Sequence, residues 1–209
     1  MHSITTSLLA YTAAAVVLVV TPGLDTALVL RTAAREGSRQ ALLAGIGIIT
    51  GCMVWTAVVA AGLGVLLTAS RFAYTVLRWA GAAYLLWVGF NLLRHPRASF
   101  TTDDKSLRSR GSAFVRGALT NLLNPKVGVF YVSFLPQFVP PDVSVAPYIF
   151  LLGVILALLG LVWFFCLIAA MRPLVAWLRH ASVMRALDRL TGGIFVVFGV
   201  GLAIEARAR

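Results

Sequence analysis

The stretch Thr21-Pro22-Gly23-Leu24-Asp25 interrupts an otherwise apolar run that extends from Ser7 to Leu30. A second stretch, Asn124-Pro125-Lys126, interrupts another apolar run, Gly117–Phe138. Proline removes a backbone donor and clashes with the preceding helical turn, and glycine lets the backbone leave helical angles. Each run is long enough to cross a hydrocarbon core, which takes about 20 residues. The two stretches therefore predict two membrane helices that are broken in their interior, at Pro22-Gly23 and at Asn124-Pro125.

The composition agrees with a membrane protein. Of the 209 residues, 60% are hydrophobic and only 12% are charged, although the net charge is +11. A soluble domain carries about 25% charged residues, and a disordered chain needs low hydrophobicity, so both classes are excluded. The basic residues stand in short clusters between apolar runs and not on one wettable face, which argues against a nucleic-acid partner. We expect an all-α integral membrane protein in contact with the lipid bilayer.

Six apolar runs are candidate transmembrane helices. Continuous apolar runs of this length are typical of helices, because strands of a membrane barrel alternate over about ten residues. No Lys or Arg precedes the first run, so we interpret it as a retained span and not as a signal peptide. The six runs are Ser7–Leu30, Ala41–Ala69, Trp79–Leu93, Gly117–Phe138, Tyr148–Met171 and Leu190–Ile204.

The positions of the basic residues predict the orientation. Thirteen of the 18 Lys and Arg residues follow the first, third and fifth runs, four lie on the other side, and Lys126 lies inside a run. Because cytoplasmic loops carry the excess of basic residues, the side with thirteen is predicted to be cytoplasmic. Both termini are then expected outside.

The polar stretch 94–112 divides the chain into two triplets of runs, 1–93 and 113–209. Glycines recur eight residues apart in the last run of each triplet, at Gly81 and Gly89 and at Gly193 and Gly201. Since three is an odd number, the two triplets must have opposite orientations. This predicts a 3+3 inverted repeat, an arrangement found in secondary transporters with broken helices at the repeat interface.

The two breaks are expected at the same depth. Pro22 lies nine residues before Arg31, and Pro125 lies nine residues after Arg116. At 1.5 Å per residue, each break is about 13 Å inside the cytoplasmic edge, near the middle of the bilayer. Proline kinks can simply shape helix packing, and that alternative is open for each break taken alone.

Asp25 and Lys126 are charged residues inside these runs, and each stands beside a break. An intramembrane charge is costly and faces a partner or a wet cavity. One hypothesis is a site for a zwitterion that includes Gly23, in which Asp25 takes an ammonium group and Lys126, with the exposed amides at a half-helix start, takes a carboxylate. Asn121 and Asn124, one turn apart, could add neutral hydrogen bonds. The alternative is a structural Asp25–Lys126 ion pair that joins the two triplets, and the two hypotheses are compatible.

The remaining features are interpreted mainly as packing. Small residues at four-residue steps allow close helix approach, and no histidine has the spacing of a metal ligand. Asp188 and Arg189 are expected to form a solvated pair at the cytoplasmic edge. The small residues are Ala41, Gly45, Gly47 and Gly51, and the aromatic residues expected to face lipid or the interface are Trp79, Tyr84, Trp87, Phe130, Tyr131 and Phe134.

Two cysteines, Cys52 and Cys166, lie in apolar runs, where a thiol is usually an inert packing group. A membrane thiol–disulfide redox protein is the alternative from a different class. Such a protein would need an accessible cysteine beside the broken helices. Those places hold Gly23, Leu24 and Lys126 instead.

With these motifs in place, the chain resembles the LysE/RhtB family of bacterial amino-acid exporters, the lysine exporter and homoserine/threonine resistance type. The resemblance covers nearly the whole length. It rests on Thr21-Pro22-Gly23 with Asp25, Leu28-Val29-Leu30-Arg31, the glycines up to Gly51, Gly81-Ala82-Ala83-Tyr84-Leu85 with Gly89, Asn124-Pro125-Lys126 through Pro136-Gln137-Phe138, and Arg189 with the glycines that follow. The family motif is often Pro-Gly-Pro-Asp, and Leu24 here replaces its second proline.

The resemblance implies export of amino acids from the cytoplasm across the inner membrane, driven by the proton-motive force. No further acidic residue is evident inside the runs, which favours neutral substrates such as threonine, homoserine or leucine. Exporters of basic amino acids or of another small solute are alternatives. No enzymatic activity, cofactor or metal is expected, and the oligomeric state, including a homodimer, is left open.

Overall fold

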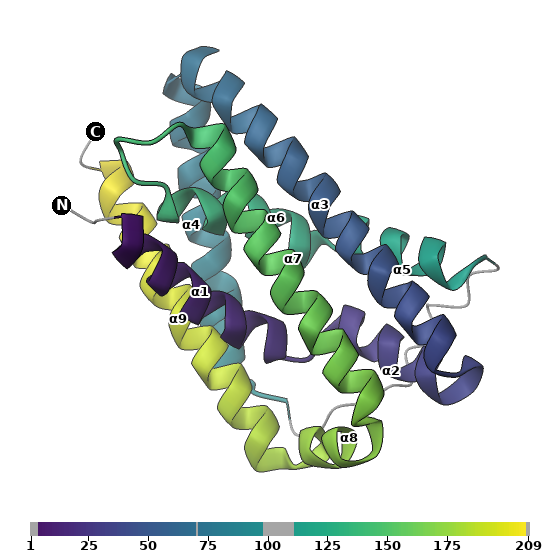
Figure 1. The fold of residues 1–209 in the computed structure, drawn as a ribbon. Helices are drawn as coiled ribbons and strands as arrows, with labels where there is room; N and C mark the ends of the chain where they lie inside the picture. The colour runs from purple at the N-terminus through teal and green to yellow at the C-terminus, as the bar shows by residue number, and fades with distance from the viewer. Residues whose placement is uncertain (1–3, 70, 98–110, 208–209) are drawn as a thin grey trace.

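The computed structural model describes residues 4–69, 71–97 and 111–207, and its regular structure over these ranges is helical (Figure 1). The helices are α1 Ile4–Val20, α2 Leu24–Glu36, α3 Ser38–Ala69, α4 Arg71–Arg94, α5 Ala113–Leu122, α6 Pro125–Phe134, the 3-10 helix η2 Leu135–Phe138, α7 Val145–Ala169, α8 Met171–Arg179 and α9 Ala181–Arg207. The all-α prediction is confirmed for this part of the chain.

Several of these helices fit a membrane span. By length and composition, Ser38–Gly62 of α3 and the whole of α7 could each cross a membrane. Taken together as one span that is bent by 47° at its break, α1 and α2 are also long and apolar enough to cross a membrane. The first predicted break is therefore present. The count of six spans is not decided by these criteria.

Two helices begin earlier than their apolar runs. The third run was expected from Trp79, but α4 begins at Arg71, and the last run was expected from Leu190, but α9 begins at Ala181. Polar residues extend both helices because tertiary packing overrides hydropathy: α9 packs along α4 and contacts α8 in its first turns. The extra helix α8, in the segment after α7, was not predicted.

The helices form two main packed groups. One group is α3 with α5 and α7, and the other is the pair α4 and α9. The first turn of α1 and the last turn of α9 lie near each other at one end of the molecule, away from α8 (Figure 1). An even number of crossings would place both termini on one side in this way.

Glycines allow the backbones of α3 and α5 to touch. A Cβ on Gly47 would lie 2.0 Å from the carbonyl oxygen of Phe114, and a Cβ on Gly117 would lie 2.0 Å from that of Ala44. Gly89 of α4 and Gly192 of α9 approach in the same reciprocal way, each with a Cβ position 2.8 Å from the other's carbonyl oxygen. The packing role predicted for the small residues of α3 is confirmed. Gly193, expected as part of the glycine pattern, faces open space.

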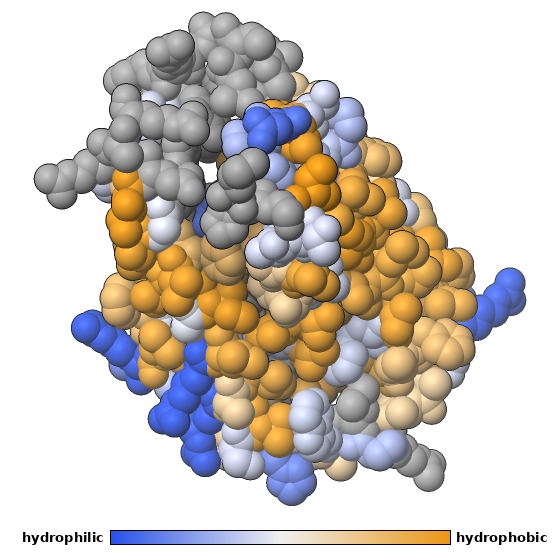
Figure 2. Space-filling view, turned by 60° about the vertical axis from the view of Figure 1, so that its left-hand side comes forward, coloured by the Kyte–Doolittle hydropathy of each residue, from blue (hydrophilic) through white to orange (hydrophobic). Residues whose placement is uncertain are grey.

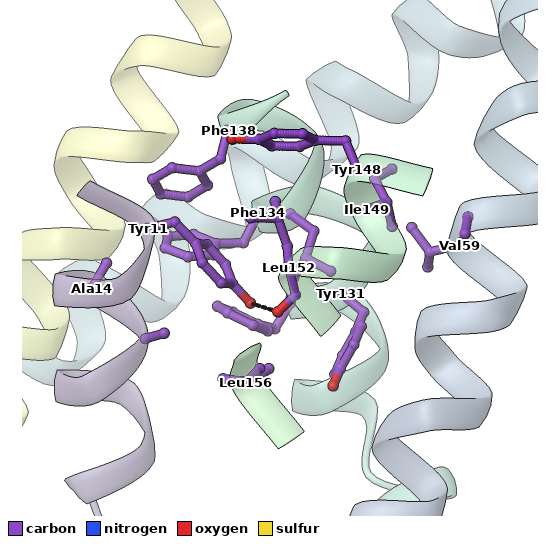
Figure 3. Packing of buried hydrophobic residues seen from close by; sticks show 14 of the residues in the cluster. Tyr11, Ala14, Val59, Tyr131, Phe134, Phe138, Tyr148, Ile149, Leu152 and Leu156 are labelled. Atoms are coloured by element: carbon purple, nitrogen blue, oxygen red, sulfur yellow. Dashed lines mark hydrogen bonds between the residues drawn. The ribbon is translucent and has the colours of Figure 1, made fainter. Parts of the chain in front are cut away.

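Buried apolar residues form two clusters. One contains α2 with parts of α3, α7, α8 and α9. The other contains the aromatic residues of α1, α6, η2 and α9, and Figure 3 shows part of it. Phe130, Tyr131 and Phe134 belong to this second cluster and are at most 4% exposed, so the prediction that they face lipid is wrong. The reason is that α6 is enclosed by α3, α4 and η2.

The outer surface is apolar. Figure 2 shows hydrophobic residues over the middle of one face, with hydrophilic residues gathered toward its lower end. Trp79 and Trp87 are 47% and 65% exposed, as predicted for side chains that meet lipid. Tyr84 is half-buried beside Trp87.

Substitution of Gly47 or Gly117 by alanine should destabilise the protein by about 1–3 kcal/mol or more, because a methyl group would overlap a backbone carbonyl. The measurement is the midpoint of thermal unfolding of the purified protein in detergent. Gly193→Ala is the matched control, since nothing lies within 4 Å of its Cβ position. Equal midpoints for Gly47→Ala and Gly193→Ala would contradict the close approach of α3 and α5.

Candidate functional site

The first break separates α1, which ends at Val20, from α2, which begins at Leu24. Pro22 cannot donate a backbone hydrogen bond, so the turn preceding it loses a partner. Thr21 closes the last turn of α1, because its amide and its hydroxyl both donate to the carbonyl of Val17, at 3.0 and 2.8 Å. Gly23 is extended, with φ −135° and ψ −160°, and a Cβ there would meet nothing within 4 Å. The break therefore follows from Pro22 and does not require the conformational freedom of Gly23.

Arg97 binds the backbone of this break. Its Nη1 donates to the carbonyl of Pro22 at 2.8 Å. The same guanidinium binds the carboxylate of Asp188 in α9 through two hydrogen bonds, from Nη2 to Oδ1 at 2.6 Å and from Nε to Oδ2 at 3.0 Å. The backbone amide of Arg97 also donates to Oδ2, at 2.8 Å. One arginine thus connects the segment after α4, the start of α9 and the break in the first helix.

Asp188 is not solvated, so the prediction of an exposed Asp188–Arg189 pair is wrong. The Asp188 side chain is 0% exposed, whereas that of Arg97 is 39% exposed. The physical reason is the early start of α9, which places Asp188 inside the helix and against the break. A hydroxyl–hydroxyl contact of 2.6 Å between Thr21 and Thr191 fixes the same junction one turn further along α9.

The second break separates α5, which ends at Leu122, from α6, which begins at Pro125. Pro125 occupies the first helical position, where its missing N–H costs nothing. The carbonyl of Asn124 accepts the amides of Val127 and Gly128, at 3.0 and 3.1 Å, which starts the new helix. Both breaks predicted from the sequence are therefore present.

The two breaks meet through side chains. Asn121 Nδ2, in the last turn of α5, donates to Asp25 Oδ2, in the first turn of α2, at 2.9 Å. The same amide nitrogen lies 3.4 Å from the Cys52 thiol of α3. The start of a helix favours a negative charge, so α2 stabilises the Asp25 carboxylate. Of the residues predicted for the site, Asp25 and Asn121 are brought into contact.

Gly51 makes room for this contact. A Cβ on Gly51 would lie 2.7 Å from Asn121 Oδ1 and 3.0 Å from Asn121 Cβ. The Asn121 side chain is fully buried as a result. The close approach of α3 and α5 thus determines the direction in which Asn121 reaches Asp25.

Other predicted site residues are placed only in part. Asn124 is buried at the second break, 8% exposed. Lys126 is the second residue of α6, but its side chain lies outside the described part of the chain. The Asp25–Lys126 pairing therefore stays a prediction, and so does the linker 94–112, most of which also lies outside that part.

Sequence reasoning missed Arg97, Asp188, Cys52 and Thr191. Arg97 was counted only as one of the cytoplasmic basic residues. A signal did exist for Asp188: the last run was too short unless its helix began earlier, and an earlier start puts Asp188 inside it. No group of three or more His, Cys, Asp or Glu side chains suited to a metal ion occurs among the described residues.

Comparison with known proteins places the chain in a family. The model of the family described as LysE type translocator matches residues 16–206. The chain belongs to the LysE family of translocators. The LysE family is one of membrane transporters, and the apolar helices of this chain agree with that assignment.

Several known proteins are similar to this LysE family member over nearly their whole length. A homoserine/homoserine lactone efflux protein of Salmonella typhimurium is 31% identical over 199 residues, which are 95% of this chain and 97% of that protein. A threonine efflux protein of Salmonella typhi is 30% identical over 195 residues, 91% and 94% of the two chains. The membrane protein YrhP of Bacillus subtilis is 31% identical over 204 residues, 93% and 97% of the two chains. No solved structure matches this member of the LysE family.

The buried pair should respond unequally to removal of its two charges. Arg97→Gln leaves the fully buried Asp188 carboxylate uncompensated and should cost about 3–5 kcal/mol. Asp188→Asn leaves an arginine that reaches water, so it should cost less, and the double variant should recover part of the loss of Arg97→Gln. The measurement is again the thermal midpoint in detergent.

The control is the Arg116–Glu36 bridge, with the same N–O distance of 2.6 Å but a Glu36 side chain that is 41% exposed. Glu36→Gln should cost about 1 kcal/mol or less. If Arg97→Gln were as mild as Glu36→Gln, Arg97 would not hold the break.

Proposed function

We propose that this LysE family member exports small neutral amino acids, such as threonine, homoserine or leucine, from the cytoplasm across the bacterial inner membrane, driven by the proton-motive force. The observation that carries the proposal is the contact between Asp25 and Asn121, which joins two broken helices far apart in the sequence. Broken helices at a repeat interface form the binding sites of many secondary transporters. The named activities of the homoserine and threonine efflux relatives point in the same direction.

In the proposed site, Asp25 takes the ammonium group of the substrate. Asn121 holds the Asp25 carboxylate in place through its amide. The amides of Val127 and Gly128 already donate to the carbonyl of Asn124, so they are not available to a ligand. The substrate carboxylate therefore binds to Lys126, at the start of α6. Asp25 would also accept a proton in the absence of substrate, and this would couple export to the proton gradient.

The pattern of helix contacts supports a 3+3 inverted repeat. Within the first triplet, 1–93, the broken span is α1 and α2, and within the second, 113–209, it is α5 and α6. The helix after each broken span contacts the first half of the other triplet's broken span: α3 packs against α5, and α7 packs against α1. The last long helices, α4 and α9, pack against each other through reciprocal glycines. This exchange of partners is what a twofold relation between six spans requires.

The charge balance near the site favours a neutral substrate. A cationic amino acid would need an acidic residue for its side chain in addition to Asp25. Of the other acidic side chains that the structure describes, Asp188 is engaged by Arg97, Glu36 by Arg116, and Asp142 is exposed in a loop. Exporters of basic amino acids are therefore a weaker alternative. The redox alternative has no supporting observation in the described part of the chain, where Cys52 and Cys166 are both free thiols.

Export should raise the tolerance of expressing cells to toxic analogues of the exported amino acids, and collapse of the proton gradient with a protonophore should abolish the gain. Asp25→Asn should lose at least about nine tenths of the export rate, because the ammonium group loses its counter-charge. The measurement is efflux of labelled threonine, homoserine and leucine, in cells and in proteoliposomes.

The matched control is Asp142→Asn, which makes the same chemical change in the loop after η2, where Asp142 is exposed. It should export at the wild-type rate. Wild-type export by an Asp25→Asn protein would overturn the role of Asp25. No change in tolerance across a broad panel, with the protein present in the membrane, would overturn the proposed function itself.

A further inference from the structure

Asp25 and Asn121 account for the part that all amino acids share, and they leave open what distinguishes one side chain from another. Two buried hydrogen-bonding groups close to this pair have no hydrogen-bond partner among the described residues: the Tyr131 hydroxyl and the Trp55 indole nitrogen. Tyr131 as a whole is only 1% exposed. A buried polar group without a partner is costly, and natural proteins retain few of them without a reason. The two groups are therefore candidates for binding a ligand.

Both groups lie where α3 faces α6. A Cβ on Gly128 of α6 would stand 2.7 Å from the outer edge of the Trp55 ring, so the ring packs directly on the α6 backbone. One turn further along α6, the Tyr131 hydroxyl has the Cys52 thiol and the Thr56 hydroxyl of α3 as its polar neighbours. Figure 3 shows the Tyr131 hydroxyl directed away from the rings of Phe134 and Phe138.

This layer is continuous with the Asp25–Asn121 pair. Cys52 lies against the Asn121 amide on one side and near the Tyr131 hydroxyl on the other. Cys52 is also the residue that packs against both apolar clusters. The polar groups thus form a band between the two clusters, from the broken helices to the α3–α6 contact.

Two other hydroxyl groups near this band have partners. The Thr56 hydroxyl donates to the carbonyl of Cys52 at 2.8 Å, and the Tyr11 hydroxyl donates to the carbonyl of Leu152 at 2.8 Å. Tyr11 and Tyr131 are neighbours in the same aromatic cluster, yet only the hydroxyl of Tyr11 is satisfied by the protein. In this band, the Tyr131 hydroxyl and the Trp55 indole nitrogen have no hydrogen bond of ordinary geometry among the described residues.

We propose that the Tyr131 hydroxyl and the Trp55 indole N–H form a side-chain subsite that binds a hydroxyl or other hydrogen-bond acceptor on the side chain of the exported amino acid. This inference rests on the proposed function. In the proposed repeat, α3 belongs to the first triplet and α6 to the second, so relative movement of the triplets opens this contact to the substrate. A substrate with a hydroxyl pairs the donors, whereas an alkyl side chain of the same shape leaves them unpaired.

A site built on such donors discriminates strongly against an analogue that lacks the acceptor. Threonine and valine provide the comparison, because they differ by a hydroxyl in place of a methyl group at nearly the same volume. The experiment measures how each amino acid competes with efflux of labelled threonine from proteoliposomes that contain the full-length protein. The wild type should prefer threonine over valine by about tenfold or more.

Tyr131→Phe should reduce this preference to about threefold or less, by weakening the competition by threonine and leaving that by valine unchanged. Trp55→Phe keeps an aromatic ring and removes the N–H, and it should shift the preference in the same direction. This second variant tests the subsite even if Tyr131→Phe fails to fold. The matched control is Tyr148→Phe, since the Tyr148 hydroxyl is also buried without a partner among the described residues but lies in the first turn of α7. This control should keep the wild-type preference.

An unchanged ratio of threonine to valine in both Tyr131→Phe and Trp55→Phe, with wild-type folding, would overturn the subsite and leave the proposed export intact. An equal loss of preference in Tyr148→Phe would also overturn it, because the effect would then follow from burial alone. If the wild-type protein exported no amino acid, that result would contradict the proposed function, and the subsite that rests on it would be contradicted as well.

Discussion

The carbonyl oxygen of Pro22 is the group on which the site depends. A helix broken inside a membrane exposes backbone groups that find no water there, and each must be satisfied by the protein or by a wet cavity. Arg97 supplies a donor to that carbonyl and is itself held by the fully buried Asp188. Because Asp188 belongs to α9, the bend in the first span is tied to the α4–α9 pair. The direction of α2, and with it the position of Asp25, follows from this attachment.

The second constraint is the close approach of α3 and α5. Gly47 and Gly117 bring the two backbones into contact, and Gly51 leaves the space that Asn121 fills. Asn121 of α5 is then aimed at Asp25 of α2. A carboxylate and an amide from two broken spans meet where neither span could build a polar site alone. The features most obvious in the sequence, the two prolines, act here mainly by placing other residues.

Much of this fold follows from local chemistry. Hydropathy and proline placement predict the long apolar helices and both breaks, but not α8 or the early starts of α4 and α9, because the length of an apolar run and the missing proline N–H are properties of single segments. Asp25 and Asn121 were predicted to belong to one site but not to be in direct contact. The signal was the equal depth predicted for the two breaks. The Arg97–Asp188 pair could not be predicted in this way. It joins residues 91 positions apart, and basic residues at a cytoplasmic edge satisfy the charge pattern whether or not they are buried. The prediction for the aromatic residues of α6 was wrong for a related reason, since hydropathy does not distinguish a side chain that faces lipid from one that faces another helix.

In the proposed function, the two broken helices share one binding site through Asp25 and Asn121. The most direct test exchanges the two side chains, in the variants Asp25→Asn, Asn121→Asp and the double swap, and measures the affinity of each purified protein for threonine by titration calorimetry. Asn121→Asp alone places two carboxylates together, and Asp25→Asn alone removes the charge, so both should bind threonine weakly. The double swap restores one carboxylate and one amide at the same point, and it should bind at least about tenfold more tightly than either single variant, a difference of about 1.4 kcal/mol in binding free energy. A double swap that binds no better than the weaker single variant would show that the two residues act independently, and would contradict a shared site.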